Sequence, residues 1–258
     1  MTIGIAVNST KDVGLVYAGE VSAWLKSRGY TVAWDDEAYK SDFLVVLGGD
    51  GTMLRESKMA ALQNTPMLGI NLGYLGYLTD VDRTDGFEAI EKMLSGNYRQ
   101  EQRMMLKVKD KLALNEVFLR GDTSKLATFR ICAGGGDGPY WHMDTLRADG
   151  IIVATPTGST AYNLSAGGPI LKPDSEMIVV TAVCPHTLYA RPWVLSGKDE
   201  VQITPVDENA TVFLDGEAKF SLQVGEGIVI GRSEHVATVV KTSGMDFFEV
   251  LRKKMGNA

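Results

Sequence analysis

The feature that most constrains the fold is a glycine-rich turn that joins an apolar strand to a helix. Residues 43–47 are all apolar and typical of a buried strand, and Gly48-Gly49-Asp50-Gly51-Thr52 follows at once. Glycines let backbone N–H groups approach an anionic oxygen, and the positive end of the next helix points to the same place. Because the carboxylate of Asp50 repels phosphate, we expect it to accept a proton or hold a metal ion. The combination favours phosphoryl transfer over passive nucleotide binding.

Composition and charge narrow the class of protein. The chain has 258 residues, 45% of them apolar and 22% charged, which is enough for two modest globular domains. The net charge of −6 argues against nucleic-acid binding but permits a small phosphorylated ligand at a locally positive site. Cys132 and Cys184 have no metal-ligand spacing and are expected to stay unpaired. We see no leader sequence and no membrane-length apolar run, so we expect a cytoplasmic protein without a membrane partner.

The first third of the chain alternates segments with strand and helix patterns. Strands are expected at residues 3–7, 30–34, 43–47 and 66–71, and helices at residues 13–28, 53–63 and 86–94. Strands separated by helices imply a parallel sheet with right-handed crossovers, and ligands bind such sheets at the carboxyl ends of the strands. The glycine turn is expected to lie at that edge.

From about Met104 the pattern changes to short strands divided by turn residues, which is typical of a β-rich domain. The expected strands are 106–108, 114–120, 128–133, 141–146, 150–154, 177–182, 200–205, 210–214, 220–224, 227–230 and 237–241. A last helix is expected over residues 246–255, with basic residues in its final turns. We therefore predict an α/β domain over residues 1–100, on which the 245–258 helix packs, and a β-rich domain over residues 101–244.

Two adjacent polar residues interrupt an apolar stretch in the expected strand 114–120. Asn115 and Glu116 point to opposite faces of a strand, so at least one of them faces inward and needs a hydrogen-bond partner. A sugar with vicinal hydroxyls would satisfy an amide and a carboxylate together. A solvated strand edge is the alternative, and the pair alone does not decide between the two.

A longer segment combines hydroxyl side chains with small residues. After the expected strand 150–154, residues 155–160 read Thr-Pro-Thr-Gly-Ser-Thr, and Tyr162 adds an aromatic face with a polar tip. This composition suits a purine or a carboxamide, so we expect ligand contact here. A second Gly-Gly-Asp-Gly, at residues 135–138, lies between strand-like residues and is expected to be an exposed loop without chemistry. His186 could be a base or a structural histidine, and its role is left open.

Together these segments resemble the NAD kinases, the family that phosphorylates NAD to NADP. The residues that carry the resemblance are Gly48–Thr52, Asn115-Glu116, Asp149-Gly150 leading into Thr155–Tyr162, Pro185–Leu188 with Arg191-Pro192, and Asp215-Gly216. They occur in the order of the family and span nearly the whole chain. Diacylglycerol and sphingosine kinases share the glycine turn, whereas the Thr-Pro-Thr-Gly-Ser-Thr-Ala-Tyr segment together with Asn-Glu is specific to the NAD kinases.

The resemblance implies a fold, a reaction and a mechanism. It implies a Rossmann-like first domain, a β-sandwich-like second domain that binds NAD, an active site between them, and a homodimer or homotetramer. The γ-phosphoryl group of ATP, or of another triphosphate or polyphosphate, would be transferred to the 2′-hydroxyl of the adenosine ribose of NAD. Asp50 would be the general base. Mg²⁺ or another divalent ion would be held chiefly by the phosphates, without dedicated protein ligands.

The resemblance also implies which residues bind the nucleotides. Asn115 and Glu116 would hold the nucleotide, Asp149 would grip a ribose beside Arg147, and Tyr77, where the family often has Phe, would stack. The complete implied set is Gly48, Gly49, Gly51, Thr52, Arg55, Tyr77, Asn115, Glu116, Arg147, Asp149, Thr157, Thr160, Ala161, Tyr162, Ser165 and Glu217.

Two alternatives belong to other functional classes. A lipid kinase of the diacylglycerol type would share the glycine turn but gives no reason for the segment 155–162. The final helix, moreover, offers a membrane only Arg252, Lys253 and Lys254 as basic residues. A non-catalytic NAD(P) sensor could have the same fold, but the presence of Asp50 gives no sign that a base has been lost.

Overall fold

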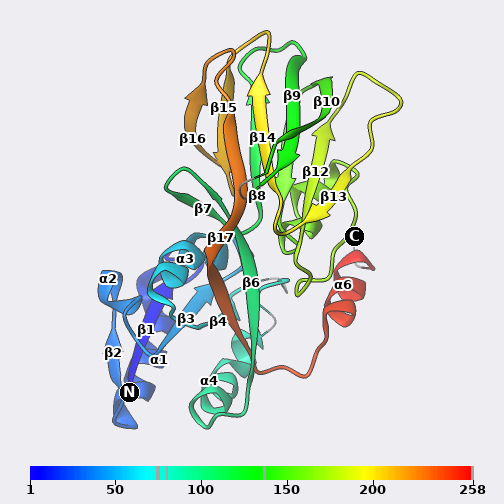
Figure 1. Cartoon of the computed structure of the whole chain (residues 1–258). Coiled ribbons are helices and arrows are strands. Elements are labelled where there is room, and N and C mark those ends of the chain that lie inside the picture. The colour runs from blue at the N-terminus through cyan, green and yellow to red at the C-terminus, as the bar shows by residue number, and fades with distance from the viewer. Residues whose placement is uncertain (74–75, 80, 136–137, 257–258) are drawn as a thin grey trace. The chain divides into compact units, whose positions relative to one another are not determined.

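The chain forms two compact units in the computed structural model, which describes residues 1–73, 76–79, 81–135 and 138–256 (Figure 1). The first unit comprises Met1–Gln102 and His235–Ala258, and the second comprises Arg103–Glu234. The first is an α/β unit and the second is built from β-strands, which is the fold class predicted from the sequence.

A parallel sheet forms the centre of the first unit. Its strands are β1 (Thr2–Val7), β2 (Thr31–Ala33), β3 (Phe43–Gly48), β4 (Met67–Asn71), β5 (Val81–Asp82) and the last part of β17 (Ile228–Lys241). The order is β17-β4-β3-β1-β2, and β5 also pairs with β4. Because the chain moves from β1 outward to β2 and then returns past β1 to β3, the winding direction reverses between β1 and β3. The turns that follow these two strands therefore open side by side, at the position where such sheets bind ligands.

Helices complete the first unit. They are α1 (Val16–Ser27), α2 (Asp35–Ala38), α3 (Asp50–Gln63), α4 (Gly86–Leu94) and α6 (Phe247–Met255), with short 3₁₀ turns η1 (Val13–Leu15) and η2 (Arg83–Asp85). Consecutive residues of β3 from Leu44 to Leu47 are all buried, as expected for a parallel strand covered on both faces. One core cluster joins Ile3, Val45 and Ile70 of the sheet to Leu25 of α1 and Ile90 of α4.

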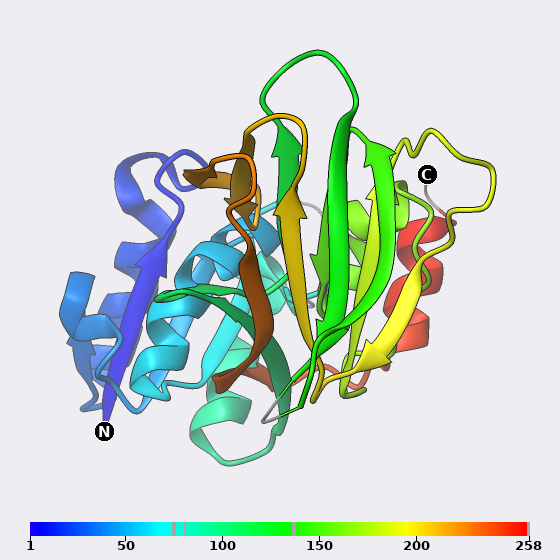
Figure 2. The ribbon, with the colours of Figure 1, turned by 45° about the horizontal axis from the view of Figure 1, so that its top comes forward.

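Two antiparallel sheets form the second unit. One has the order β13-β12-β11-β8-β15-β16, and the other contains β10, β9, β14 and the first part of β17, which pairs with β14. Figures 1 and 2 show β9, β10 and β14 side by side. Inward-facing residues of both sheets, among them Leu119 and Val153 of one and Phe129 and Ile203 of the other, belong to one buried cluster, so the unit is a β-sandwich.

The bounds of the second unit's elements are as follows: β6 (Arg99–Val108, which begins in the first unit), β7 (Lys111–Ala113), β8 (Glu116–Gly121), β9 (Ala127–Gly134), β10 (Trp141–Ala148), β11 (Gly150–Ala154), η3 (Gly158–Thr160), α5 (Tyr162–Ser165), β12 (Met177–Val183), β13 (Trp193–Ser196), β14 (Glu200–Pro205), β15 (Ala210–Leu214) and β16 (Glu217–Leu222).

Several elements differ from those expected. The two strands expected at 227–230 and 237–241 are one strand, β17, because its first part pairs with β14 and its last part with β4. The strand expected from Leu114 starts at Glu116, after a bend. The helix expected from Met53 starts at Asp50. Residues 136 and 137 of the expected Gly-Gly-Asp-Gly loop lie outside the described residues, and both cysteines are free.

Candidate active site

The glycine turn is shaped by close backbone contacts. Gly49 is extended (φ −120°, ψ −167°) and is the N-cap of α3, so Asp50 is the first helical residue. A Cβ atom on Gly48 would lie 2.2 Å from Oγ1 of Thr52, which leaves no room for a side chain. The first N–H groups of a helix have no acceptor within the helix. The turn therefore presents free donors and the positive end of α3 at the carboxyl edge of the sheet.

Asp50 is fixed by the turn formed by residues 76–79. Its Oδ2 accepts a hydrogen bond from the Tyr77 N–H (2.7 Å), and its Oδ1 accepts from the N–H groups of Leu78 (2.9 Å) and Thr79 (3.2 Å) and from the Thr79 hydroxyl (3.3 Å). A Cβ atom on Gly76 would lie 1.9 Å from Oδ1. These donors balance much of the negative charge that would otherwise repel a phosphate.

Two residues that sequence reasoning missed lie beside the glycine turn. Nζ of Lys11 lies 3.1 Å from the Cβ position of Gly49 and 3.5 Å from that of Gly73. Asn71 is buried, its Oδ1 accepts from the Gly73 N–H (3.0 Å), and its Nδ2 has no partner among the residues described. Lys11 follows β1 and Asn71 ends β4, the two strands that flank β3, so their places at the carboxyl ends of these strands were the signal that could have found them.

In the second unit, Asp215 organises the segment that carries Asn115 and Glu116. Its carboxylate accepts from the N–H groups of Leu114 (3.1 Å), Asn115 (2.8 Å) and Glu116 (3.3 Å). This explains why the Asp-Gly pair matters although it lies far along the chain. It holds the start of β8 by three backbone contacts.

The segment 155–160 packs directly on Asn115. The Thr155 N–H donates to the carbonyl of Asn115 (2.9 Å), and the Thr155 hydroxyl donates to that of Leu114 (2.6 Å). A Cβ atom on Gly158 would lie 2.0 Å from the Asn115 carbonyl oxygen, so glycine is required there. The structure therefore brings together the two motifs that the sequence analysis selected separately.

Glu116 is buried without a complete set of partners. The residue is 7% exposed, and its Oε2 accepts no hydrogen bond from any residue that the structure describes. Burial raises the pKa of this carboxyl from 4.5 to about 7, and the negative charge of Asp215 adds to the rise. An unsatisfied buried acceptor costs free energy, which a donor hydroxyl on a ligand would recover.

Some hydroxyl and amide groups of this segment are structural. The Ser159 hydroxyl donates to the carbonyl of Pro156 (2.6 Å) and accepts from the Leu171 N–H (2.9 Å). The Asn163 amide donates to the carbonyl of Ser159 (3.1 Å) and accepts from the Thr181 hydroxyl (2.7 Å). These bonds fix the loop, and the Thr160 hydroxyl also donates within it, to the carbonyl of Thr157 (3.3 Å).

The remaining predicted residues of the segment surround that fixed loop. Thr157 is buried, and its hydroxyl lacks a partner within the described part of the chain. The Tyr162 ring packs edge-to-face on Phe118, with 5.2 Å between centroids, and is 41% exposed. Thr160 and Ala161 are half-buried and Ser165 is exposed. A flat, partly exposed ring next to unpaired polar groups can receive a base or a carboxamide.

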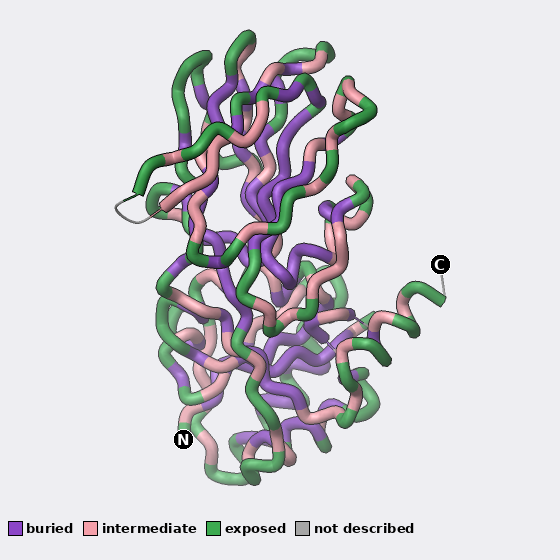
Figure 3. Tube along the Cα trace, turned by 45° about the vertical axis from the view of Figure 1, so that its right-hand side comes forward, coloured by how far each residue is buried: buried purple, intermediate pink, exposed green. Residues whose placement is uncertain are grey.

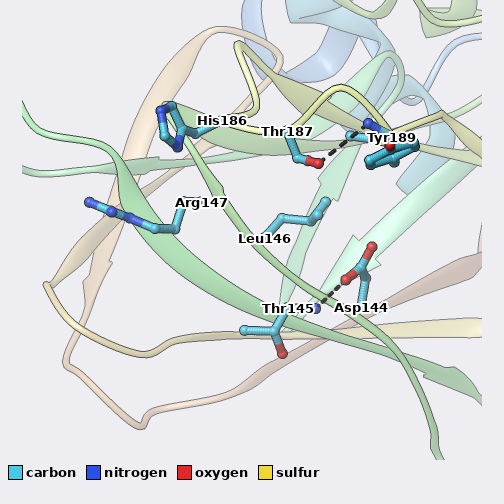
Figure 4. A pocket seen from close by; sticks show the side chains of 8 residues that line it. Asp144, Thr145, Leu146, Arg147, His186, Thr187 and Tyr189 are labelled. Carbon is cyan, nitrogen blue, oxygen red and sulfur yellow. Dashed lines mark hydrogen bonds between the residues drawn. The ribbon is translucent and has the colours of Figure 1, made fainter.

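Arg147 and Asp149 lie at the other end of β11. The strand has five residues, so about 17 Å separates Asp149 from the end at which Thr155 lies. Arg147 lines a surface hollow of about 390 Å³ together with Asp144, His186 and Tyr189 (Figure 4). The strand thus separates this pair from Glu116, which pairs with Ala154 at the far end of β11, and the structure places His186 near Arg147.

Two further predicted residues are engaged by ion pairs. Arg55 Nη2 lies 2.6 Å from Oε1 of Glu56 on the same helix. Glu217 lies exposed on β16, where it pairs with Lys219. No group of three His, Cys, Asp or Glu side chains that could hold a metal ion occurs in the described ranges, and no helix there is long and apolar enough to cross a membrane.

The chain has the architecture of a phosphotransferase: an α/β unit with a glycine turn and a fixed acid, followed by a β-sandwich. Residues 38–98 match the ATP-NAD kinase N-terminal domain, and residues 114–242 match the ATP-NAD kinase C-terminal domain. The NAD kinase of Caldanaerobacter subterraneus is 38% identical over 98% of both chains, and that of Geotalea daltonii is 37% identical over 96% of this chain and 95% of its own. The chain belongs to the NAD kinase family.

Solved structures agree with that assignment. An NAD kinase from Archaeoglobus fulgidus, in complex with ATP, is similar with a TM-score of 0.81 and 28% identity, over 99% of this chain and 98% of that one. Yeast NADH kinase shares the fold, with a TM-score of 0.83 and 24% identity. The match covers 99% of this chain and 87% of the yeast chain. The NAD kinase function predicted from the sequence is confirmed, and the lipid kinase and sensor alternatives are not supported.

Proposed function

We propose that Asp50 is the general base with which this NAD kinase phosphorylates the 2′-hydroxyl of the adenosine ribose of NAD. The observation that carries the proposal is the fixed position of Asp50, held by the 76–79 turn at the first residue of α3. As the γ-phosphorus forms a bond to the 2′-oxygen, its bond to the leaving oxygen of ADP breaks and the hydroxyl proton moves to Asp50. NADP and ADP are the products.

The donor phosphates are proposed to bind over the glycine turn. Its free N–H groups, the positive end of α3 and the ammonium of Lys11 all favour negative charge, and Asn71 supplies an unpaired amide. Lys11 makes no ion pair with any described residue, so a cation beside a positive helix end stays unbalanced until an anion binds. ATP, another triphosphate or polyphosphate would each meet this requirement.

NAD is proposed to bind to the second unit. Ribose hydroxyls would donate to the unsatisfied Glu116 carboxylate and accept from Asn115, while the base or carboxamide lies against Tyr162, among Thr157, Thr160, Ala161 and Ser165. We propose that the first unit thus carries the base and the donor site and the second the NAD site.

We propose that the other predicted residues also contact the bound nucleotides. Tyr77, Arg55, Arg147, Asp149 and Glu217 would contact nucleotide groups. A divalent ion such as Mg²⁺ would arrive on the triphosphate, be held chiefly by its phosphates and neutralise their charge. We also propose a cytoplasmic homodimer or homotetramer, on the resemblance stated above.

The test is NADP formation from NAD, ATP and Mg²⁺, measured with an NADP-specific dehydrogenase. Asp50→Asn keeps the size and most hydrogen bonds but removes the base, so we expect a rate loss of roughly 10²-fold or more with little change in NAD affinity. Asp36→Asn, an exposed acid on α2, is the matched control and should keep full activity. An unchanged rate in Asp50→Asn would refute the assignment of the base.

A further inference from the structure

The last helix places an ammonium group next to the proposed base. α6 begins with a capping box, in which the Glu249 N–H donates to Asp246 (2.8 Å) and the Asp246 N–H donates to Glu249 (2.9 Å). At its other end, Nζ of Lys254 lies 3.5 Å from Oδ2 of Asp50 and 4.4 Å from the centroid of the Tyr77 ring. Both partners of Lys254 thus belong to the proposed catalytic site.

Anchoring α6 does not explain this contact. A partly exposed ion pair contributes little to stability, and the Lys254 and Asp50 side chains are 29% and 32% exposed. Val250 is the buried residue of α6, and Figure 3 shows the rest of the helix as half-buried or exposed. The neighbouring Lys253 instead donates to Sδ of Met245 (3.1 Å). The fold therefore directs one specific lysine to Asp50.

The two oxygens of Asp50 have different surroundings. Oδ1 accepts three hydrogen bonds, from Leu78 and Thr79, whereas Oδ2 accepts one, from Tyr77, and faces Lys254. Oδ2 is consequently the oxygen with a lone pair left for a proton. A carboxylate that accepts a proton next to a triphosphate must also avoid repelling it, and a cation beside Oδ2 removes that repulsion.

We propose that Lys254 is a further catalytic residue, whose ammonium contacts both Oδ2 of Asp50 and the oxygens of the phosphoryl group in transfer. The inference rests on the proposed role of Asp50. Lys254 holds the phosphoryl oxygens near the base while the 2′-oxygen bonds to phosphorus, the bond to ADP breaks and the proton moves to Oδ2. The ammonium itself keeps all its protons. Its contribution is a positive charge between the carboxylate of Asp50 and the oxygens of the phosphoryl group.

The test compares variants of the full chain by steady-state kinetics for both substrates. Lys254→Met keeps the apolar stem and should lower kcat by roughly 10²-fold, with the NAD KM within about threefold. Lys254→Arg keeps the charge and should recover about a tenth or more of the rate. Lys253→Met is the matched control and should stay within about twofold of wild type. In the Asp50→Asn background, Lys254→Met should cost far less, because the two residues act on one step.

Four results would overturn the inference, and each is distinct from failure of the proposed function. Near-normal kcat in Lys254→Met means that Lys254 is not used, and a raised kcat means that it blocks the base. Full additivity with Asp50→Asn means that the two residues act independently. Loss that Lys254→Arg does not restore, with faster tryptic cleavage at Arg252 and Lys253, means that α6 has detached and the role is structural. If wild type makes no NADP, the proposed function fails instead.

Discussion

Lowering the pH should protonate Glu116 and weaken NAD binding. In the free chain, burial raises the pKa of this carboxyl from 4.5 to about 7, with a smaller contribution from Asp215. Ribose hydroxyls that donate to Glu116 stabilise its charged form, so bound NAD should lower that pKa again. Binding near pH 6.5 should therefore release a proton, and affinity should rise with pH until Glu116 is ionised in the free chain.

The magnitude follows from the ionised fraction. With a pKa of about 7, roughly 3% of the carboxyl is ionised at pH 5.5 and roughly three quarters at pH 7.5. If the charged form alone accepts the ribose hydroxyls, NAD affinity rises about 25-fold between these two values and changes little above pH 8.

Titration calorimetry without a phosphoryl donor measures both quantities. Affinity is followed from pH 5.5 to 8.5, and proton release is obtained from two buffers of different ionisation enthalpy. Glu116→Gln should bind NAD more weakly at pH 8 and lose the pH dependence. A pH slope that persists unchanged in Glu116→Gln, or its absence in the wild type, would refute the reasoning.

The stability of the ligand-free chain gives a second readout with the opposite sign. Between pH 4.5 and about 7 the folded chain keeps a proton on Glu116 that the unfolded chain has lost. The slope of the unfolding free energy with pH is then negative, so stability falls as the pH rises through this window, by at most about 3 kcal/mol. Glu116→Gln should remove this loss and unfold at a higher temperature than wild type at pH 8.

Two other substitutions test separate parts of the site. Lys11→Met should raise the KM for ATP about tenfold or more and leave the KM for NAD unchanged, because the ammonium binds the donor phosphates. Steady-state kinetics measures both constants, with Lys26→Met as the control. An equal rise in both constants would contradict this role. Gly158→Ala should destabilise the second unit by about 1–3 kcal/mol and weaken NAD binding, because its Cβ would collide with the Asn115 carbonyl. Denaturant unfolding measures the loss, and unchanged stability with normal binding would contradict the packing argument. The control is Gly167→Ala, where nothing lies within 4 Å but φ is +86°, so that it reports backbone strain without a collision.

Local sequence was enough to predict the bounds of a strand where turn residues lie directly at both of its ends. The strands at 150–154, 200–205 and 210–214 were predicted with the observed bounds, since a polar residue precedes each one and a polar residue or a proline stands at its end. β17 was divided in two because Gly231 to Glu234 is polar, whereas pairing with a different strand at each end makes it continuous. The edge strand β13 has three residues that are exposed, so it carries no burial pattern to detect.

Some residues of the candidate site could likewise be predicted from local sequence, and others could not. Asp50, Glu116 and the segment 155–162 stand out because polar groups or glycines interrupt apolar strands, which is a local signal. Lys11 and Lys254 look like ordinary surface lysines in the sequence. Only the place of Lys11, a few residues after the first strand, could have marked it. The place of Lys254 depends on where the last helix packs, and a single sequence does not contain that information.

The way in which Asp50 is held also bears on how this site can evolve. Three of its hydrogen bonds come from backbone N–H groups at residues 77–79, and a backbone donor is present whatever side chain the residue carries, proline excepted. Mutation can therefore replace the aromatic ring of Tyr77 and change what the enzyme accepts next to its base without displacing the base. The geometry of catalysis is inherited largely through the backbone, which leaves the side chains of residues 77 and 78 free to diverge, whereas Gly76 has no room for a Cβ atom and the Thr79 hydroxyl itself donates to Asp50.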